Sequence, residues 1–261
     1  MGNLNGIELF LIDMDGTICL GDTVIDGAFE FVSKIKKTGR NYIYLTNNSS
    51  LAGKDYVKKL RALGFPCADD EIFTSGMATA LYLNEKHAGE RVFLVGTKAF
   101  EEELAGYGID VSYDGASGVV CGFDRELTYE KLEKAVRLLR RGAKFIAANP
   151  DFVCPMPDDD VLPDCGSICA LLTAACGVEP IYIGKPNRNL VDIISRDAGV
   201  PVKKIATIGD RLYTDMMLAK NSGCVSILVM SGETTKEMLG ASPYKPDFVF
   251  PSVKELEKLI I

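Results

Sequence analysis

The sequence predicts an α/β protein built on a mostly parallel sheet, and two observations carry this prediction. Short runs of β-branched and aromatic residues alternate with helical patterns from one end of the chain to the other. Four apolar runs also stop abruptly at polar clusters, which begin at Asp13, Thr46, Gly184 and Gly209. In an open parallel sheet the carboxyl ends of the strands gather at one ligand-binding edge, so these clusters are expected to converge.

The individual elements follow from hydrophobic periodicity. Strands are expected over residues 8–12, 41–45, 91–95, 118–121, 143–147, 204–208 and 225–229. Amphipathic helices, with apolar residues three and four positions apart, are expected over residues 27–37, 53–63, 128–140, 187–198 and 213–222. Glycines follow several of these helical patterns, as helix C-caps commonly do.

Composition sets the class of protein. With 261 residues, 47% of them hydrophobic, the chain is long enough for one large domain or two ordinary ones with a buried core. The net charge of -7 and the dispersed Lys and Arg residues argue against a nucleic-acid polymer or an anionic membrane as partner. We find no apolar stretch of roughly 18 residues and no secretory signal, so a cytoplasmic location is expected.

Eight cysteines are spread thinly along the chain, which favours free thiols over a disulfide framework. Cys165, Cys169 and Cys176 recur at helical spacing, where small thiols pack well against a core. A zinc or redox role is the less favoured alternative, because there is no CxxC pair and the only histidine, His87, lies far away in the sequence.

The sharpest chemical signal is the pair Asp13 and Asp15 at the end of the first expected strand. Gly16 and Thr17 follow, where the backbone can turn tightly and present N–H groups to an anion. In the cleavage of a phosphate ester, one carboxylate can attack phosphorus. A second carboxylate can protonate the leaving oxygen and later activate water. We therefore expect Asp13 to be the nucleophile and Asp15 the general acid and base. A solvated turn or a metal-only DxD site of the glycosyltransferase kind are the alternatives.

The segment LFLIDMDGT resembles the first motif of the haloacid dehalogenase (HAD) superfamily of aspartate-nucleophile phosphotransferases, and the later clusters match its other motifs in order. LTNN resembles the second motif, which implies that the Thr46 hydroxyl binds the transferring phosphoryl group and that Asn47 offers amide contacts. Gly-Lys-Pro resembles the third, which implies that Lys185 neutralises charge on the nucleophile and the phosphoryl oxygens. Asn48 and Arg211 complete the substrate-binding residues that the resemblance suggests.

The fourth motif, Gly-Asp-Arg-Leu-Tyr-Thr-Asp, implies a metal site. Asp210 is expected to bind Mg²⁺ directly, and Asp215 to bind it through water or to orient Lys185. Asp13 and the backbone carbonyl of Asp15 would supply the other protein ligands. The oxygen-only ligand supply favours a hard cation such as Mg²⁺. A structural reading would make Asp210 a helix cap and Asp215 a partner of the helix dipole.

The form of the fourth motif and an insert after the second resemble the NagD-like, 4-nitrophenylphosphatase branch with a type IIA (C2) α/β cap. The implied architecture is a Rossmann-like parallel-sheet HAD core of residues 1–75 and 183–261 with an inserted α/β cap of residues 76–182. Cap segments 119–125 and 151–164 are expected to line the leaving-group pocket. The acidic run at 158–160 is expected to be a solvated turn rather than a calcium loop.

The function that the resemblance implies is a Mg²⁺-dependent phosphatase acting on small nucleotide, sugar or aryl phosphomonoesters through an aspartyl-phosphate. Two alternatives stay open: a phosphomutase or phosphotransferase on the same scaffold, and a non-catalytic sensor that binds a phosphorylated ligand. The expected partner is a small phosphorylated metabolite, and a homodimer is considered possible.

Overall fold

The computed structural model describes residues 4–156 and 160–260, and the chain divides into two compact units. Unit 1 comprises Met1–Thr46, Val57–Phe73 and Lys185–Ile261, and unit 2 comprises Asn47–Tyr56 and Thr74–Gly184. The predicted inserted cap falls inside unit 2, which in addition contains residues 47–56. The assignment of these units as core and cap domains stays a prediction.

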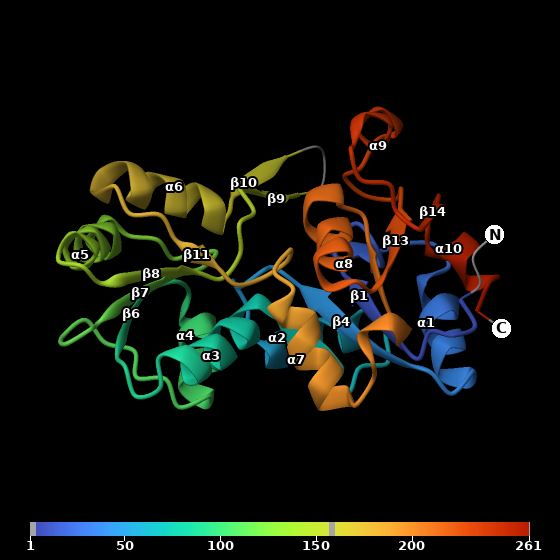
Figure 1. The fold of residues 1–261 in the computed structure, drawn as a ribbon, viewed down its shortest axis with the longest axis horizontal. Helices are drawn as coiled ribbons and strands as arrows, with labels where there is room; N and C mark the ends of the chain where they lie inside the picture. Colours follow the sequence, from blue (N-terminus) through green and yellow to red (C-terminus); the bar gives the residue numbers. More distant parts are fainter. Residues whose placement is uncertain (1–3, 157–159, 261) are drawn as a thin grey trace. The chain divides into compact units, whose positions relative to one another are not determined.

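Unit 1 is built on a six-stranded sheet in the order β14-β13-β12-β1-β4-β5 (Figure 1). Its strands are β1 (Leu9–Asp13), β4 (Asn41–Thr46), β5 (Ile72–Thr74), β12 (Ile205–Gly209), β13 (Val225–Val229) and β14 (Phe248–Phe250). β1 pairs in parallel with both β4 and β12, and it is buried along its whole length. The strand order changes direction beside β1, so its carboxyl end lies at a topological switch point, where α/β sheets bind ligands.

The remaining elements of unit 1 are short helices and one small hairpin. The helices are α1 (Ala28–Lys37), α2 (Gly53–Ala62), α7 (Asn189–Ala198), α8 (Met217–Ser222), α9 (Lys236–Ala241) and α10 (Val253–Glu257), and α2 begins in unit 2. The hairpin of β2 (Cys19–Leu20) and β3 (Thr23–Val24) follows β1 directly. In α1 the buried residues are Ala28, Phe31, Val32 and Ile35, which is the apolar stripe that its spacing predicts.

Unit 2 contains a four-stranded parallel sheet in the order β11-β8-β7-β6. Its strands are β6 (Val92–Val95), β7 (Gly118–Cys121), β8 (Lys144–Ala147) and β11 (Ile181–Tyr182), and its helices are α3 (Ser75–Lys86), α4 (Lys98–Gly106), α5 (Tyr129–Arg140) and α6 (Cys165–Cys176). Strands β9 (Val153–Pro155) and β10 (Val161–Pro163) form a hairpin before α6. Apolar side chains of β7 and β8 pack with α5 and α6 in one core cluster.

The third polar cluster corrects the prediction that all four follow strands of one sheet. The apolar run before Gly184 forms β11, which pairs with β8 in the sheet of unit 2. The other three clusters follow β1, β4 and β12 of unit 1. A run of two or three apolar residues fits a strand in either sheet, so periodicity alone cannot assign it.

One helix also differs from its prediction. The pattern predicts a regular helix over residues 213–222, but Leu212–Met216 forms a π-helical turn and α8 begins only at Met217. Such turns occur frequently at functional sites. Here the turn contains Asp215, which is fully buried and accepts a hydrogen bond from the backbone N–H of Arg211 at 3.2 Å. Asp215 therefore lies inside the unit and not on a solvated first turn.

The cysteines are all free thiols. Cys165 and Cys169 lie one turn apart on α6 with their Sγ atoms 3.9 Å apart, and Cys121 at the end of β7 joins them. All three are fully buried within the core cluster of unit 2, and Cys176 packs against that cluster. The packing role that helical spacing predicts is therefore confirmed for the α6 cysteines, while the approach of Cys121 was not visible in the sequence.

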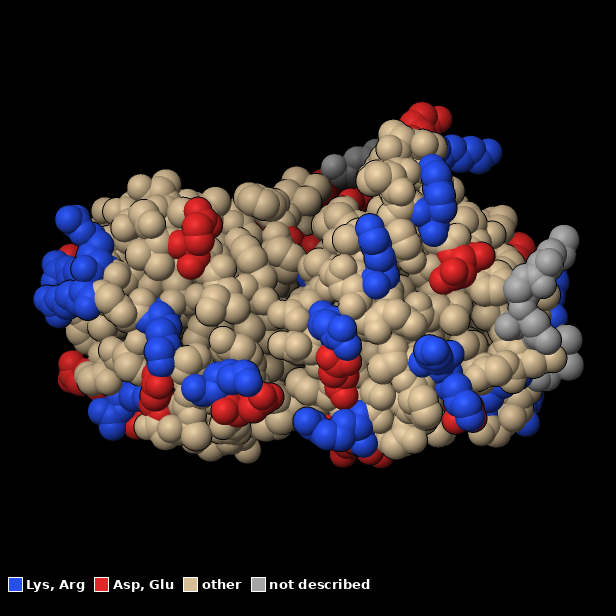
Figure 2. Space-filling model, viewed as in Figure 1, with Lys and Arg blue, Asp and Glu red and all other residues tan. Residues whose placement is uncertain are grey.

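Charged groups are distributed without large blocks of one sign over most of the face shown in Figure 2. Surface pairs such as Arg188 with Asp192 and Lys254 with Asp26 follow this pattern. Within the described parts of the chain, no helix is both long and apolar enough to span a membrane. Of the predicted acidic turn at 158–160, the first two residues lie outside the described residues, and Asp160 is exposed.

Asp164 is a buried carboxyl at the start of α6. It is only 4% exposed, and its Oδ1 accepts a hydrogen bond from the backbone N–H of Cys165 at 2.5 Å. Burial raises the pKa of Asp164 to about 8, and the negative charge of Asp151 adds to this effect. The carboxyl is therefore largely protonated in the folded protein at neutral pH.

We expect Asp164→Asn to stabilise the protein more at pH 8.5 than at pH 5.5. A carboxyl whose pKa is raised on folding, here from 3.8 to about 8, stabilises the fold when protonated, and this contribution is lost as pH rises through that window. Asn keeps a capping oxygen but cannot ionise. The free energy of unfolding of both proteins should be measured across this range. A difference between them that does not vary with pH would contradict the assignment.

Candidate active site

Three strands of unit 1 bring predicted site residues to one edge of the sheet. Asp13 ends β1, and the parallel register pairs it with Leu45, so that Thr46 lies one residue beyond. Asp210 follows β12 directly, on the other side of β1. The side chains of Asp13, Thr46 and Asp210 are all buried. The strand-end prediction is thus confirmed for these three positions.

Lys185 supplies a buried ammonium group between two carboxylates. Its Nζ donates to Asp13 Oδ1 and, at 2.6 Å, to Asp215 Oδ1. Lys185 is 3% exposed. Burial alone would lower the pKa of Lys185, but the charges of Asp13 and Asp215 and their hydrogen bonds raise it above the ordinary lysine value. The ammonium therefore stays charged inside the protein.

The carboxylates around Lys185 exceed its single positive charge. Burial raises the pKa of Asp13 well above its ordinary value; Lys185 opposes this effect, and the charges of Asp215 and Asp210 add to it. Burial likewise raises the pKa of Asp210 to about 7, with a further contribution from Asp215. The site thus holds more negative charge than its own cation neutralises, and it favours either protons or a second cation.

Three of these carboxylates fit a metal ion. Asp13, Asp210 and Asp215 each offer an oxygen, and these atoms lie within 4.8 Å of one another. Oδ1 of Asp210 is buried without a hydrogen-bond partner among the described residues, whereas Oδ2 accepts from the backbone N–H of Glu233 at 2.6 Å. A buried oxygen without a donor is unfavourable, and an all-oxygen set suits a hard cation such as Mg²⁺. The residues present therefore fit the expected ion.

A loop after β13 shapes the site, and the sequence analysis missed it. Besides the N–H of Glu233, this loop provides the Thr234 hydroxyl, which donates to the backbone carbonyl of Asp210 at 2.5 Å. The Ser231 hydroxyl donates to the carbonyl of Gly16 at 2.7 Å. The signal was present, because the apolar run of β13 ends on Met-Ser-Gly in the same way as the four clusters that were recognised.

Two glycines leave room for the Asp210 carboxylate. A Cβ atom built on Gly16 or on Gly232 would overlap its Oδ2. Gly16 also adopts a φ of +87°, a conformation that favours glycine. The Gly16 of the first motif is therefore required by two separate constraints, one from the backbone and one from the neighbouring acid.

The remaining predicted site residues differ in exposure, in hydrogen-bond partners and in the unit to which they belong. Asp15 is partly exposed, unlike Asp13. The Thr17 hydroxyl donates to Asp13 Oδ2 at 3.5 Å. The guanidinium of Arg211 forms an ion pair with Glu233 at 3.0 Å. Asn47 and Asn48 belong to unit 2, where Asn48 Oδ1 accepts hydrogen bonds from Ser50.

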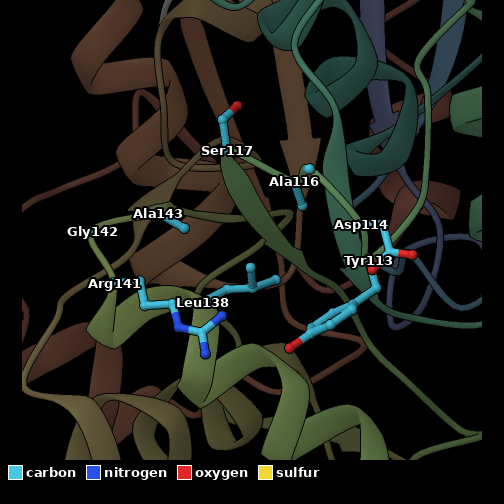
Figure 3. A pocket seen from close by; sticks show the side chains of 9 residues that line it. Tyr113, Asp114, Ala116, Ser117, Leu138, Arg141, Gly142 and Ala143 are labelled. Carbon is cyan, nitrogen blue, oxygen red and sulfur yellow. The ribbon is translucent and has the colours of Figure 1, made fainter.

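A separate pocket of about 440 Å³ lies within unit 2 (Figure 3). Ser117 and Ala143, which directly precede β7 and β8, line it together with Arg141 at the end of α5. It therefore lies at the amino ends of parallel strands, opposite the edge where such sheets bind ligands. The C-terminal end of a helix also disfavours anions. We assign it no part in the candidate active site.

Comparison with known proteins agrees with this geometry. Residues 10–110 match the family model of haloacid dehalogenase-like hydrolases, and residues 182–256 match a second model described as HAD-hydrolase-like. The 5′-nucleotidase YutF of Bacillus subtilis is 34% identical over 94% of this chain and 96% of its own length. The chain belongs to the haloacid dehalogenase-like hydrolase family.

Solved structures of this family extend the likeness to the whole fold. A 4-nitrophenylphosphatase from Thermotoga maritima is 45% identical, with a TM-score of 0.96 over 100% of both chains. NagD from E. coli K-12 is 29% identical, with a TM-score of 0.87 over 95% of this chain and 98% of its own. A glycerol phosphate phosphatase from Mycobacterium tuberculosis, solved in complex with magnesium, is 28% identical, with a TM-score of 0.90 over 100% of this chain and 80% of its own.

These relatives confirm the predicted family, its NagD-like and 4-nitrophenylphosphatase branch, and its α/β fold. The relatives are named phosphatases or a nucleotidase, so the predicted enzyme class holds for the family. Their names refer to different phosphorylated compounds, and none is assigned to this chain by likeness.

For this HAD-like hydrolase, Lys185→Met is expected to lower the free energy of unfolding by about 3–5 kcal/mol near pH 8, because Asp13 and Asp215 lose their buried counter-charge. Near pH 5 the loss should be smaller, since Asp13, whose pKa is already raised, can take up a proton. Chemical denaturation at the two pH values measures both effects.

A matched double variant separates charge from packing. Adding Asp13→Asn to Lys185→Met removes one uncompensated carboxylate and should recover part of the lost stability near pH 8. Equal destabilisation at both pH values, with no recovery in the double variant, would argue that Lys185 acts through packing alone.

Proposed function

We propose that this protein is a Mg²⁺-dependent phosphatase that hydrolyses small phosphomonoesters through an aspartyl-phosphate on Asp13. The observation that carries the proposal is the buried ion pair of Asp13 with Lys185 beside Asp210 Oδ1, which has no hydrogen-bond partner in the described part of the chain. This arrangement supports a carboxylate nucleophile that is held in place by one cation and needs a second. The magnesium complex of the glycerol phosphate phosphatase supports the choice of ion.

The reaction has two proton-balanced steps. Asp13 attacks phosphorus as the bond between phosphorus and the leaving oxygen breaks, and Asp15 donates a proton to that oxygen. Asp15 then accepts a proton from a water molecule whose oxygen attacks the aspartyl-phosphate. This second step releases inorganic phosphate and restores the Asp13 carboxylate. The partial exposure of Asp15 suits a group that must reach both the leaving oxygen and water.

The other residues bind and orient. Lys185 holds Asp13 and balances phosphoryl charge, Thr46 donates its hydroxyl to the phosphoryl group, and Asp215 fixes Lys185. The backbone N–H groups of Gly16 and Thr17 donate to the carbonyls of Cys19 and Met14 at 2.8 and 3.2 Å, so the prediction that they are presented to an anion is wrong for this structure. Asn47, Asn48 and Arg211 remain proposed substrate-binding residues. Mg²⁺ would be held by Asp13, Asp210 and the backbone carbonyl of Asp15. Asp215 would bind it directly or through water. When bound, the ion supplies positive charge that screens Asp13 from the phosphate dianion.

The substrate class is a small phosphomonoester rather than one named compound. The relatives' names include a 5′-nucleotidase, a 4-nitrophenylphosphatase and a glycerol phosphate phosphatase, which have very different leaving groups. Residues 119–125 and 151–164 stay the predicted lining of the leaving-group pocket. A cytoplasmic location and a homodimer stay predictions, as do the mutase and sensor alternatives. Intramolecular phosphoryl transfer without free phosphate would identify a mutase.

Asp13→Asn is expected to abolish phosphate release from 4-nitrophenyl phosphate and from a panel of metabolite phosphates in the presence of Mg²⁺, because the amide is too weak a nucleophile to form the intermediate. Thermal unfolding and circular dichroism should show that the fold persists. Acid-stable incorporation of phosphate should be seen for the wild type alone. Full turnover by the variant would overturn the nucleophile assignment.

Asp15→Asn provides a matched test of the second carboxylate. The 4-nitrophenolate ion leaves without needing a proton, so this variant should still form the aspartyl-phosphate but hydrolyse it slowly. Rapid mixing should show a burst of about one nitrophenolate per chain followed by a slow phase. A variant that hydrolyses this ester at the wild-type steady-state rate would contradict the proposed general base.

A further inference from the structure

The residue that follows Thr46 is fixed by a buried polar network in unit 2. Thr46 is the last residue of β4 and belongs to unit 1, and Asn47 is the first residue of unit 2. The backbone carbonyl of Asn47 accepts hydrogen bonds from the Ser75 hydroxyl at 2.6 Å and from Asn149 Nδ2 at 2.7 Å. All three polar side chains are buried. The peptide group after Asn47 is therefore held by two donors that come from distant parts of the chain.

The side chain of Asn47 is held as well. Its Nδ2 donates to Asp151 Oδ2 at 2.8 Å, and Asp151 is 3% exposed. Asn149 supports the same arrangement, because its Oδ1 accepts from the backbone N–H of Asp151 at 3.0 Å. A Cβ atom on Gly184 would lie 2.6 Å from Asn47 Oδ1, so a glycine is needed for this close approach. Gly184 directly precedes Lys185, the proposed phosphoryl-binding ammonium.

The use of a carboxylate in this network needs an explanation. A buried charge is unfavourable unless it is well hydrogen bonded, and stability alone is weak grounds for keeping one. A charged acceptor does, however, bind an amide donor more strongly than a neutral acceptor does. Asp151 therefore suits a position where the orientation of the Asn47 amide matters more than the contribution of Asp151 to stability.

We propose that Asp151 is a positioning residue for Thr46: by holding the Asn47 amide it fixes the end of β4 and thereby the hydroxyl of the preceding residue. This inference rests on the proposed function, which places the Thr46 hydroxyl on the phosphoryl group. It also gives Asn47 a role in addition to the proposed substrate contact, since its side-chain amide donates to Asp151.

A double-mutant cycle on turnover of 4-nitrophenyl phosphate with Mg²⁺ tests this proposal. Asp151→Ala should lower kcat by about 10- to 100-fold, because small misplacements of a binding group are costly in rate. In a Thr46→Ala background the same change should lower kcat by less than about 3-fold, because the hydroxyl that Asp151 positions is already absent. Asp151→Asn keeps an oxygen acceptor of the same shape but lacks the charge, so it should recover part of the wild-type kcat.

Glu103 provides a matched control within unit 2. It is also a buried carboxyl, 9% exposed, and accepts hydrogen bonds from the backbone N–H of Gly53 at 2.6 Å and from the Thr74 hydroxyl at 2.9 Å. Neither of these two donors belongs to Asn47. Any effect of Glu103→Ala on kcat should therefore be the same with and without the Thr46 hydroxyl. Thermal unfolding of all variants shows that each is folded at the assay temperature.

The outcomes separate the two proposals. Phosphate release by the wild type, loss on Thr46→Ala and non-additivity with Asp151→Ala support both. If the wild type is active but the Thr46 and Asp151 effects multiply, the positioning role is wrong and the proposed function stands. If Asp151→Ala does not fold, Asp151→Asn replaces it in the cycle. A loss of kcat that is larger with the Thr46 hydroxyl than without it supports the positioning role, and an equal loss in both backgrounds contradicts it. An inactive wild type overturns the proposed function and the inference together.

Discussion

The ammonium of Lys185 lies buried between the carboxylates of Asp13 and Asp215, and the rest of the candidate site depends on this ion pair. Three acids within 4.8 Å of one another repel strongly in a buried setting, so at least one fixed cation is needed to bring them together. The single positive charge of Lys185 neutralises only part of the negative charge of these three acids. The remaining charge imbalance is reflected in the raised pKa values of Asp13 and Asp210. It is also reflected in Asp210 Oδ1, which lacks a hydrogen-bond partner among the residues that the structure describes.

This imbalance connects the fold to the proposed chemistry. A parallel sheet with β1 at its switch point gathers Asp13 and Asp210 from distant parts of the chain, and the π-helical turn adds Asp215. Gly16 and Gly232 then leave space where any larger residue would displace the Asp210 carboxylate. Together they hold a cluster of carboxylate oxygens that fits a cation, and in the proposed mechanism that cation would screen Asp13 from the phosphate.

Much of the fold could be predicted because the spacing of apolar residues along a segment indicates whether it forms a strand or a helix and which face is buried. The seven predicted strands are present with ends within one residue, since continuous apolar runs bounded by polar clusters leave little choice. The positions of Asp13, Thr46 and Asp210 could also be predicted, because each lies at or just beyond a strand end. Asp215 lies in the turn after β12 and was predicted from the fourth motif alone. Short elements such as β9, β10 and β14 contain three residues each and give no comparable signal.

Other features could not be predicted because they depend on tertiary contacts. Nothing local in the sequence indicates that β11 joins the unit 2 sheet or that Asp151 holds Asn47. The polar end of β13 is visible in the sequence, but its hydrogen bonds to Asp210 are not. The most direct test of the central claim is calorimetric titration of Mg²⁺ in buffers of different ionisation enthalpy. One ion should bind per chain with release of a proton near pH 6, less release near pH 8.5, and strong weakening by Asp210→Asn. Binding that is absent, or indifferent to that substitution, would contradict the account.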